Sequence, residues 1–342
     1  MHAIDESVLG TWRIGWGRVG AGVACVIALV RPASAVPQQA GDIRYVQAAG
    51  VLVMPFDTTS GRASFAIVSR TGNGTGGPLL QTHWVFYAAD CRHLADVFVG
   101  LTDLDTVVVD PTRLQGQTQT VNPSVNHPQG PTVDLSGERG VVIVTGLGTS
   151  GQVLPQIVGG WTIADPATGA SFGGDAIGIS ADGTLPDPTL LAGGIRIPTF
   201  DPTTLTNSQV ILIGLESDGG ELHPITRASA ALGGAHVCCA ASVTDNLEVS
   251  TSIPDVCFDC VGFAAFTPAL ASTGETALLP DGVALTTAGF VRLAACRSAS
   301  GRDETALVGT GDTEQFLVVW HGQSVGRFGF VATGKYSRAT LD

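Results

Sequence analysis

Residues 236–266 constrain the fold of this chain more than any other stretch, because they combine strand-forming sequence with four of the seven cysteines. Runs rich in β-branched and aromatic residues are separated there by two pairs of turn formers, Asp245-Asn246 and Pro254-Asp255. The pattern predicts three strands, at 236–244, 247–253 and 256–266. The chain therefore has to accommodate several cysteines within a β-sheet structure.

The composition of the whole chain favours the same class of fold. Among 342 residues there are 45 Gly and 18 Pro, while charged residues make up only 14%. Such a composition suits short strands joined by tight turns, whereas surface helices are rich in Glu and Lys. Neither sustained helical periodicity nor a repeat of fixed length stands out. We predict an all-β fold, an antiparallel β-sandwich of the jelly-roll or Ig-like kind, loop-rich and with very little helix.

The N-terminal 35 residues predict export. Arg13 and Arg18 precede an apolar run at 19–30, and Ala33-Ser34-Ala35 matches the A-x-A pattern of a signal-peptide cleavage site. The run is shorter than the roughly 20 residues that span a bilayer. We interpret 1–35 as a signal peptide and expect no membrane span in the mature chain; a retained anchor is the alternative. The expected localisation is secreted, periplasmic or at the cell surface.

Six cysteines would remain after cleavage. An even number in an oxidising compartment favours disulfides, although the sequence does not choose among the many pairings. Neighbouring residues of a strand face opposite sides, so two adjacent cysteines cannot share one core. A bond between the first and second cysteine pairs of 236–266 would need 245–255 to be a loop or a crossing between sheets, because an intervening strand would hold them too far apart. The disulfide candidates are Cys91, Cys238, Cys239, Cys257, Cys260 and Cys296.

Two alternatives to disulfides start from the same stretch. Its four thiols, with His236, could supply metal ligands, but zinc sites usually present two C-x-x-C knuckles and one of the pairs here is adjacent. The Cys257-x-x-Cys260 spacing could be a redox motif, but it lacks a βαβ context. We expect no metal and no cofactor.

The mature chain is predicted to be organised around one large β-domain. Residues 36–44 are a polar lead-in, and 45–342 form the sandwich, with a Gly/Pro-rich insertion or second subdomain at about 111–205. Strand-like runs at 82–87, 97–101 and 106–109 follow one another at hairpin spacing and suggest a meander.

Catalytic motifs give no positive signal. Neither H-E-x-x-H nor G-x-S-x-G is present. Asp57-Thr58-Thr59 resembles the D-T-G loop of aspartic proteases only faintly and reads better as a turn that ends a strand. Loop carboxylates could serve a calcium site or an acid–base pair, with solvated acidic turns as the simpler interpretation. They are Asp96, Asp103, Asp105 and Asp110, with Asp182, Asp187 and Asp201 further along.

Binding is the function that these observations favour. Trp84, Trp161 and Trp320 could contact a ligand, although aromatic residues at strand spacing more often pack in a core. A net charge of −13 argues against nucleic acid as a partner. Our hypothesis is an exported, non-enzymatic protein acting in binding or in extracellular or cell-surface assembly, with an unknown protein or glycan as partner. The alternative is a secreted, glycan-directed hydrolase that uses loop carboxylates.

Overall fold

The computed structural model describes most of the chain beyond the N-terminal segment. The described residues are 48–72, 79–114, 133–167, 169–179, 195–199, 207–218, 221–225, 232, 234–245, 247–265, 276–279, 289–298, 314–325, 328–329 and 333–338. All of them belong to one compact unit, Arg44–Asp342. The predicted signal peptide and lead-in lie outside the described residues.

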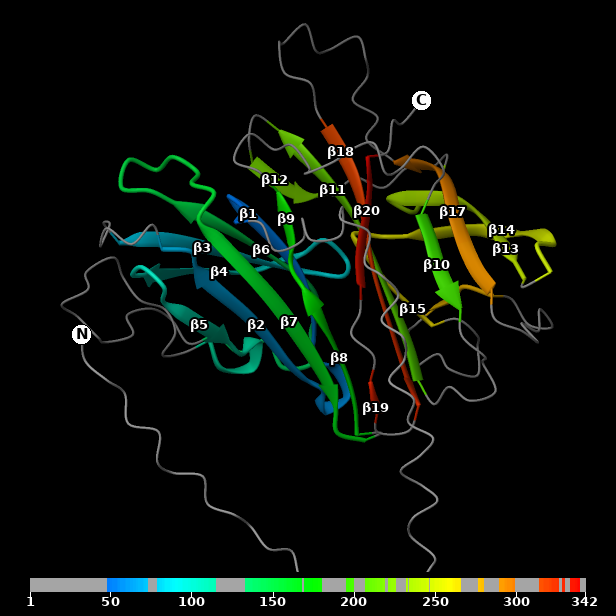
Figure 1. The fold of residues 1–342 in the computed structure, drawn as a ribbon, viewed down its shortest axis with the longest axis horizontal. Helices are drawn as coiled ribbons and strands as arrows, with labels where there is room; N and C mark the ends of the chain where they lie inside the picture. The colour runs from blue at the N-terminus through cyan, green and yellow to red at the C-terminus, as the bar shows by residue number, and fades with distance from the viewer. Residues whose placement is uncertain are drawn as a thin grey trace, which may run out of the picture. The chain divides into compact units, whose positions relative to one another are not determined.

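The described strands of this unit form four β-sheets, which confirms the all-β prediction (Figure 1). Every ladder among the described strands is antiparallel apart from the short β15–β16 pair. The first sheet has the order β4-β3-β6-β1-β9, with β1 (Val51–Asp57), β3 (Leu80–Ala88), β4 (His93–Leu101), β6 (Arg139–Leu147) and β9 (Ile177–Ile179). The second sheet has the order β5-β2-β7-β8, with β2 (Ala63–Arg70), β5 (Thr106–Val109), β7 (Ile157–Asp165) and β8 (Ala170–Asp175).

The remaining strands form the third and fourth sheets. The third sheet has the order β16-β15-β11-β18-β19, with β12 paired to β11 and β20 paired to β18. Its strands are β11 (Asn207–Asp218), β12 (Glu221–Pro224), β15 (Val261–Ala265), β16 (Thr276–Ala277), β18 (Glu314–Val325), β19 (Phe328–Gly329) and β20 (Thr333–Arg338). The fourth sheet has the order β10-β17-β13-β14, with β10 (Ile195–Thr199), β13 (Val237–Thr244), β14 (Ser250–Phe258) and β17 (Gly289–Ser298).

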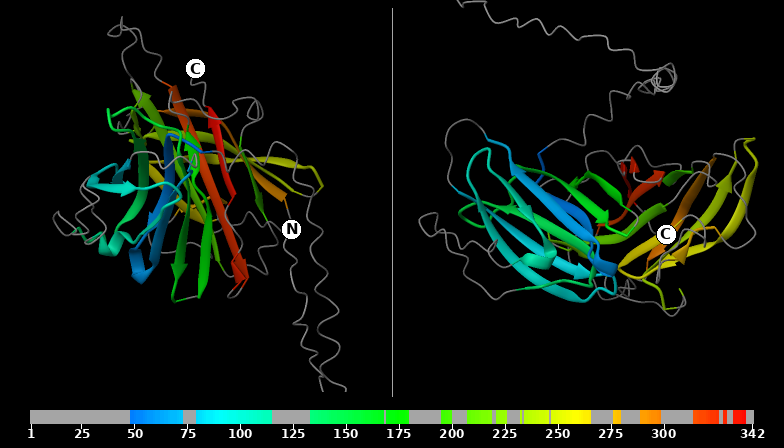
Figure 2. Two further views of the ribbon diagram at one scale, coloured as in Figure 1. Left: turned by 60° about the vertical axis from the view of Figure 1, so that its left-hand side comes forward. Right: turned by 90° about the horizontal axis from the view of Figure 1, so that it is seen from below.

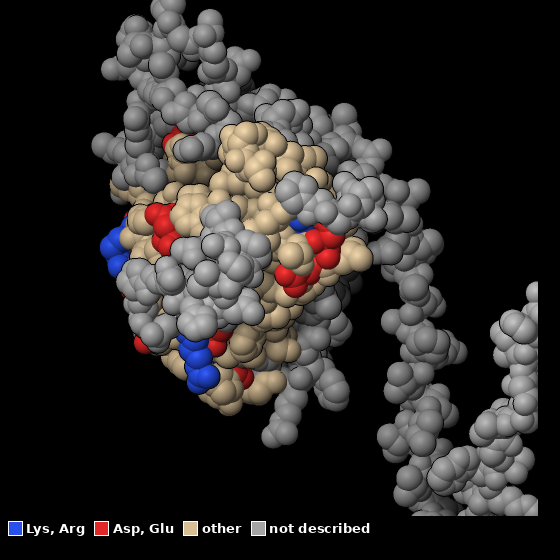
Figure 3. Space-filling model, turned by 90° about the vertical axis from the view of Figure 1, so that its left-hand side faces the viewer, with Lys and Arg blue, Asp and Glu red and all other residues tan. Residues whose placement is uncertain are grey.

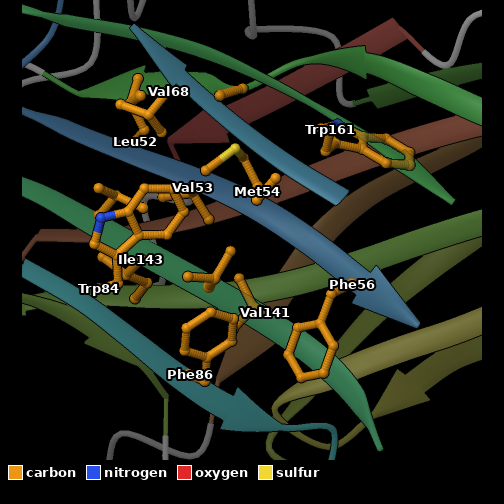
Figure 4. Packing of buried hydrophobic residues seen from close by; sticks show 14 of the residues in the cluster. Leu52, Val53, Met54, Phe56, Val68, Trp84, Phe86, Val141, Ile143 and Trp161 are labelled. Atoms are coloured by element: carbon orange, nitrogen blue, oxygen red, sulfur yellow. The ribbon is translucent and has the colours of Figure 1, made fainter. Parts of the chain in front are cut away.

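The first two sheets enclose a hydrophobic core (Figure 2). Alternate residues of β3 point into it, including the fully buried rings of Trp84 and Phe86. Figure 4 shows these rings beside the buried side chains of β1, where Phe56 meets Phe86 edge to face with 5.6 Å between ring centroids. The sheets approach closely at Gly159, since a Cβ there would lie 2.9 Å from a methyl carbon of Leu52.

Strand β11 is buried on both faces. Ile211, Ile213 and Leu215 belong to the same hydrophobic cluster as the first two sheets, while Val210 and Leu212 belong to the cluster between the third and fourth sheets. An uninterrupted apolar run is the sequence signature of a strand covered on both sides. The third sheet is therefore a layer shared by two cores.

Within 236–266 the first predicted strand is confirmed as β13, but the division of the rest at Pro254-Asp255 was wrong. Pro254-Asp255 is not a turn but lies within the single strand β14, which forms a hairpin with β13. Strand β14 is an edge strand of its sheet, and an edge position tolerates a proline because no ladder partner needs its missing N–H. The chain then turns at Asp259-Cys260 and enters β15 in the third sheet.

The predicted meander was also wrong. Strands β3 and β4 pair as a hairpin, but β5 pairs with β2 in the second sheet. Strands β6 to β9 come from the range that we expected to hold an insertion or second subdomain, and β6 lies between β3 and β1 in the first sheet. Two 3-10 turns, η3 (Thr59–Gly61) and η4 (Pro111–Arg113), are the longest helical segments of the described residues.

Candidate functional site

All six candidate cysteines are paired in three disulfides. Cys91 is bonded to Cys260, Cys238 to Cys257, and Cys239 to Cys296. Disulfides are typical of proteins from oxidising compartments. Among the described residues, no helix is long and apolar enough to cross a membrane.

The two adjacent cysteines point in opposite directions, as strand geometry requires. Cys239 contributes to the core between the third and fourth sheets, and its neighbour Cys238 lies on the opposite face of the strand, where it is buried but is not part of that core. Cys238 lies directly opposite Cys257 in the β13–β14 ladder, so the bond between them runs across neighbouring strands. We expected a strand at 247–253 to separate the two cysteine pairs. No such separate strand exists, because residues 250–253 are the first part of β14, the strand that carries Cys257.

The metal alternative finds no support in this arrangement. The sulfurs that would have been ligands are oxidised to disulfides, and His236 instead lies 3.2 Å from a carboxylate oxygen of Asp259. No group of three or more His, Cys, Asp or Glu within the described part of the chain is placed to hold a metal ion.

The three tryptophans considered as ligand contacts are buried. Trp84, Trp161 and Trp320 have exposed fractions of 0%, 2% and 0%. Trp161 of β7 meets Trp320 of β18 edge to face, with 6.3 Å between centroids. Their rings thus form part of the packing, which is the simpler of the two interpretations of their strand spacing.

Asp57 belongs to a buried turn rather than to a catalytic loop. Its carboxylate accepts hydrogen bonds from the backbone N–H and the hydroxyl of Thr59, and it pairs with Arg62 at 2.5 Å. Arg62 also lies 3.5 Å from Asp165. These contacts fasten the β1–β2 connection to β7, which is a structural role.

Three of the described acidic loop residues, Asp103, Asp105 and Asp110, have a hydrogen-bond or ion-pair partner. Asp103 pairs with Arg70 at 2.9 Å, and Asp110 accepts hydrogen bonds from the backbone and hydroxyl of Thr112. Asp105 accepts a hydrogen bond from the backbone N–H of Thr106. Asp182, Asp187 and Asp201 lie outside the described residues. Asp105 and Asp110 are therefore turn-forming side chains, whereas Asp103 belongs to an ion pair with Arg70 of β2 and Asp96 has other partners.

Asp96 lies between two histidines on the outer face of the first sheet. His83 of β3 approaches one of its carboxylate oxygens at 3.0 Å, and His93 of β4 approaches the other at 3.1 Å, both through Nε2. The ring of Phe98 stacks on His83 at 4.3 Å with an interplanar angle of 4°. Tyr87 meets His93 edge to face at 5.8 Å. We call these five residues the histidine face.

The histidine face is accessible on a rigid support. Asp96 is 47% exposed and Phe98 is 39% exposed, while the alternate residues of the same strands are buried in the first core. One carboxylate can accept from two imidazoles, and each ring has a second nitrogen, Nδ1, that can donate or accept. This surface can therefore offer a ligand an aromatic face together with several polar atoms.

Sequence analysis missed the histidine face because its residues look unrelated along the chain. Strand parity places Asp96 and Phe98 on one side of β4, but it would place His93, three residues before Asp96, on the other. The β3–β4 register, in which His83 pairs with Phe98, and the irregularity after Phe86 bring the five residues together. Only the alternation of polar and apolar residues could have indicated it.

A second exposed feature lies on the outer face of the second sheet. Phe65 and Ile67 of β2 are each 36% exposed, and Val108 of β5, directly opposite Ile67, is 48% exposed. Figure 3 shows one face of the molecule, on which acidic and basic side chains form small separate groups on an otherwise uncharged surface.

Compared with protein-family models, with curated proteins and with solved structures, the chain gives no significant match.

Proposed function

We propose that this chain is an exported, non-enzymatic β-sandwich protein that binds a glycan through the histidine face. The observation that supports the proposal is the exposed stack of Phe98 on His83 beside a carboxylate that two imidazoles approach. The three disulfides fit a protein that works outside a reducing cytosol.

The chemistry of a sugar matches this combination of groups. The C–H face of a pyranose packs on an aromatic ring, and Phe98 has one ring face covered by His83, so ligand packing would use the other. The hydroxyls need donors and acceptors, which the carboxylate of Asp96 and the imidazole nitrogens supply. A preformed hairpin also lowers the ordering cost of binding.

The test is a screen of the mature protein against an array of defined oligosaccharides, followed by titration of any hit. Phe98→Ala and His83→Ala should each weaken binding at least about ten-fold, the range expected for a central contact. Phe65→Ala is the matched control, because Phe65 is similarly exposed on another sheet and should leave binding unchanged. Absence of any hit, or a Phe98→Ala protein that binds like the wild type, would contradict the proposal.

Self-assembly is a second candidate function, favoured by the apolar patch of Phe65, Ile67 and Val108. Paired apolar residues on the open face of a sheet suit contact with another protein surface. Sedimentation of the mature protein over a range of concentrations tests it. Association that Ile67→Ser abolishes would support assembly, and a monomer at all concentrations would exclude it.

A further inference from the structure

The disulfide between Cys238 and Cys257 differs from the other two in its accessibility. Each of the three bonds has one buried cysteine, with exposed fractions of 2% for Cys238 and 0% for Cys239 and Cys260. The second cysteine is exposed only in this bond, as Cys257, whereas Cys91 and Cys296 are half-buried. A thiol in solution can therefore approach this disulfide from the side of Cys257. Among the disulfides of one protein, the exposed ones are reduced most readily by thiols.

A histidine–aspartate pair lies beside this accessible disulfide. His236 and Asp259 continue the β13–β14 pairing two residues beyond Cys238 and Cys257, where the backbone N–H of His236 donates to the carbonyl of Phe258 at 3.1 Å. Residues two apart on a strand share a face. The His236–Asp259 pair and the Cys238–Cys257 pair therefore lie on the same face of the fourth sheet. The Nδ1 atom of His236 lies 3.2 Å from the carboxylate of Asp259.

This geometry is suited to proton transfer. A carboxylate that accepts from Nδ1–H leaves Nε2 of the imidazole as the basic nitrogen, which is the arrangement that activates a nucleophile. Exchange requires a thiolate, whose formation a neighbouring base promotes. The side chain of His236 is 12% exposed and that of Asp259 is 59% exposed. On the adjacent strand β17, Arg297 occupies the position opposite Cys238.

From these observations we infer that the Cys238–Cys257 disulfide is a thiol–disulfide exchange site, with His236 as its base and small-molecule thiols as its substrates. A thiol gives its proton to Nε2 of His236, and the thiolate attacks the sulfur of Cys257. The bond to Cys238 breaks, its electron pair leaves on the Cys238 sulfur, and the imidazolium returns the proton there. A second thiol then attacks the mixed disulfide, so that two thiols are oxidised to one disulfide and Cys238 and Cys257 end as thiols.

The surrounding structure allows the exchange without unfolding. The sulfur of Cys238 lies 3.9 Å from the carbonyl oxygen of Leu232, which can accept the hydrogen of the released thiol. Strand β13 stays bonded to β17 through Cys239 and Cys296, and the β13–β14 ladder does not depend on the broken bond.

The experiment treats the oxidised mature protein with reduced glutathione, quenches with acid, alkylates and identifies the labelled cysteines by mass spectrometry. Cys238 and Cys257 should react at least about ten-fold faster than the other four cysteines. Equal labelling of all six, or faster labelling of Cys91 and Cys260, would overturn the assignment. Complete resistance of all three disulfides until denaturant is added would overturn it as well.

The role of His236 is tested by the pH profile of the same rate. In His236→Gln the rate at neutral pH should fall about three- to ten-fold, and the shape of its dependence on pH should change. Asp259→Asn should lower the rate less, because the imidazole keeps its position in the strand. His223→Gln, on strand β12 of the third sheet, is the control. An unchanged rate and profile in His236→Gln, with circular dichroism matching the wild type, would remove the histidine from the proposal.

Discussion

Cys91 and Cys260 are 169 residues apart in the sequence, and their disulfide joins the turn between β3 and β4 to the turn between β14 and β15. The backbone N–H of Val261 donates to the carbonyl of Ala89 at 3.2 Å, and the guanidinium of Arg139 lies 4.9 Å from the centre of the Phe263 ring. The bond thus reinforces a contact between the first and third sheets.

Removing this bond should destabilise the protein strongly. Because it closes a long loop, the Cys91→Ser/Cys260→Ser double variant should lose about 2–5 kcal/mol of unfolding free energy, measured by urea denaturation. The comparison is the Cys238→Ser/Cys257→Ser double variant, whose cysteines are only 19 residues apart in the sequence. It should lose less unfolding free energy, because its disulfide closes a shorter loop. The reverse order of losses would show that the long-range bond constrains little.

The buried pair of Asp57 and Arg62 makes a second prediction. Asp57→Ala removes the nearer carboxylate, at 2.5 Å, from a guanidinium that is only 8% exposed, and it also removes the acceptor of the Thr59 hydrogen bonds; Asp165 remains at 3.5 Å. The expected cost is about 3–5 kcal/mol in thermal or chemical unfolding. Asp90→Ala removes the exposed partner of Arg92 at 3.8 Å and should lower the unfolding free energy far less, because solvent screens an exposed ion pair. Similar stabilities for the two variants would contradict the structural role of Asp57.

Trp161 should behave as a core residue. Trp161→Ala removes a buried ring and the edge-to-face partner of Trp320, so we expect a loss of about 3–5 kcal/mol. Phe65→Ala, at 36% exposure, should change stability far less. Unfolding curves followed by circular dichroism give both values. A Trp161→Ala protein as stable as the wild type would place this ring outside the core.

Asp134 provides a local prediction about pH. The hydroxyl and then the backbone N–H of Ser136 donate to its carboxylate and lower the pKa of Asp134 below its ordinary value. A carboxyl group with a lowered folded pKa stabilises the folded state above its unfolded pKa, and this contribution is lost as the pH falls through the folded pKa. Ser136→Ala should raise the pKa toward the ordinary value while the backbone bond remains. Carbon NMR of the side chain measures the change, and an unaltered pKa would contradict it.

The cysteine region shows how far sequence reasoning extends. Strand alternation correctly placed Cys238 and Cys239 on opposite faces, because the two-residue period is a local property of the backbone. The error at Pro254 arose because proline and aspartate signal a turn locally, yet an edge strand accommodates both. Whether a strand will lie at an edge is decided by the packing of other segments.

The candidate site was less accessible to prediction than the fold. His83, His93 and Asp96 become neighbours only through the register of the hairpin and its irregularity after Phe86. The pairing of β5 with β2 likewise depends on contacts distant in sequence.

The sequence by itself determined the all-β class, the alternation of buried and exposed residues and the six cysteines available for pairing, since each follows from composition or from the period of an extended strand. The tertiary structure alone decided which cysteines are bonded, which strands share a sheet and which polar residues meet at the surface. These depend on how the sheets bury one another's apolar faces, as β11 does for two cores at once.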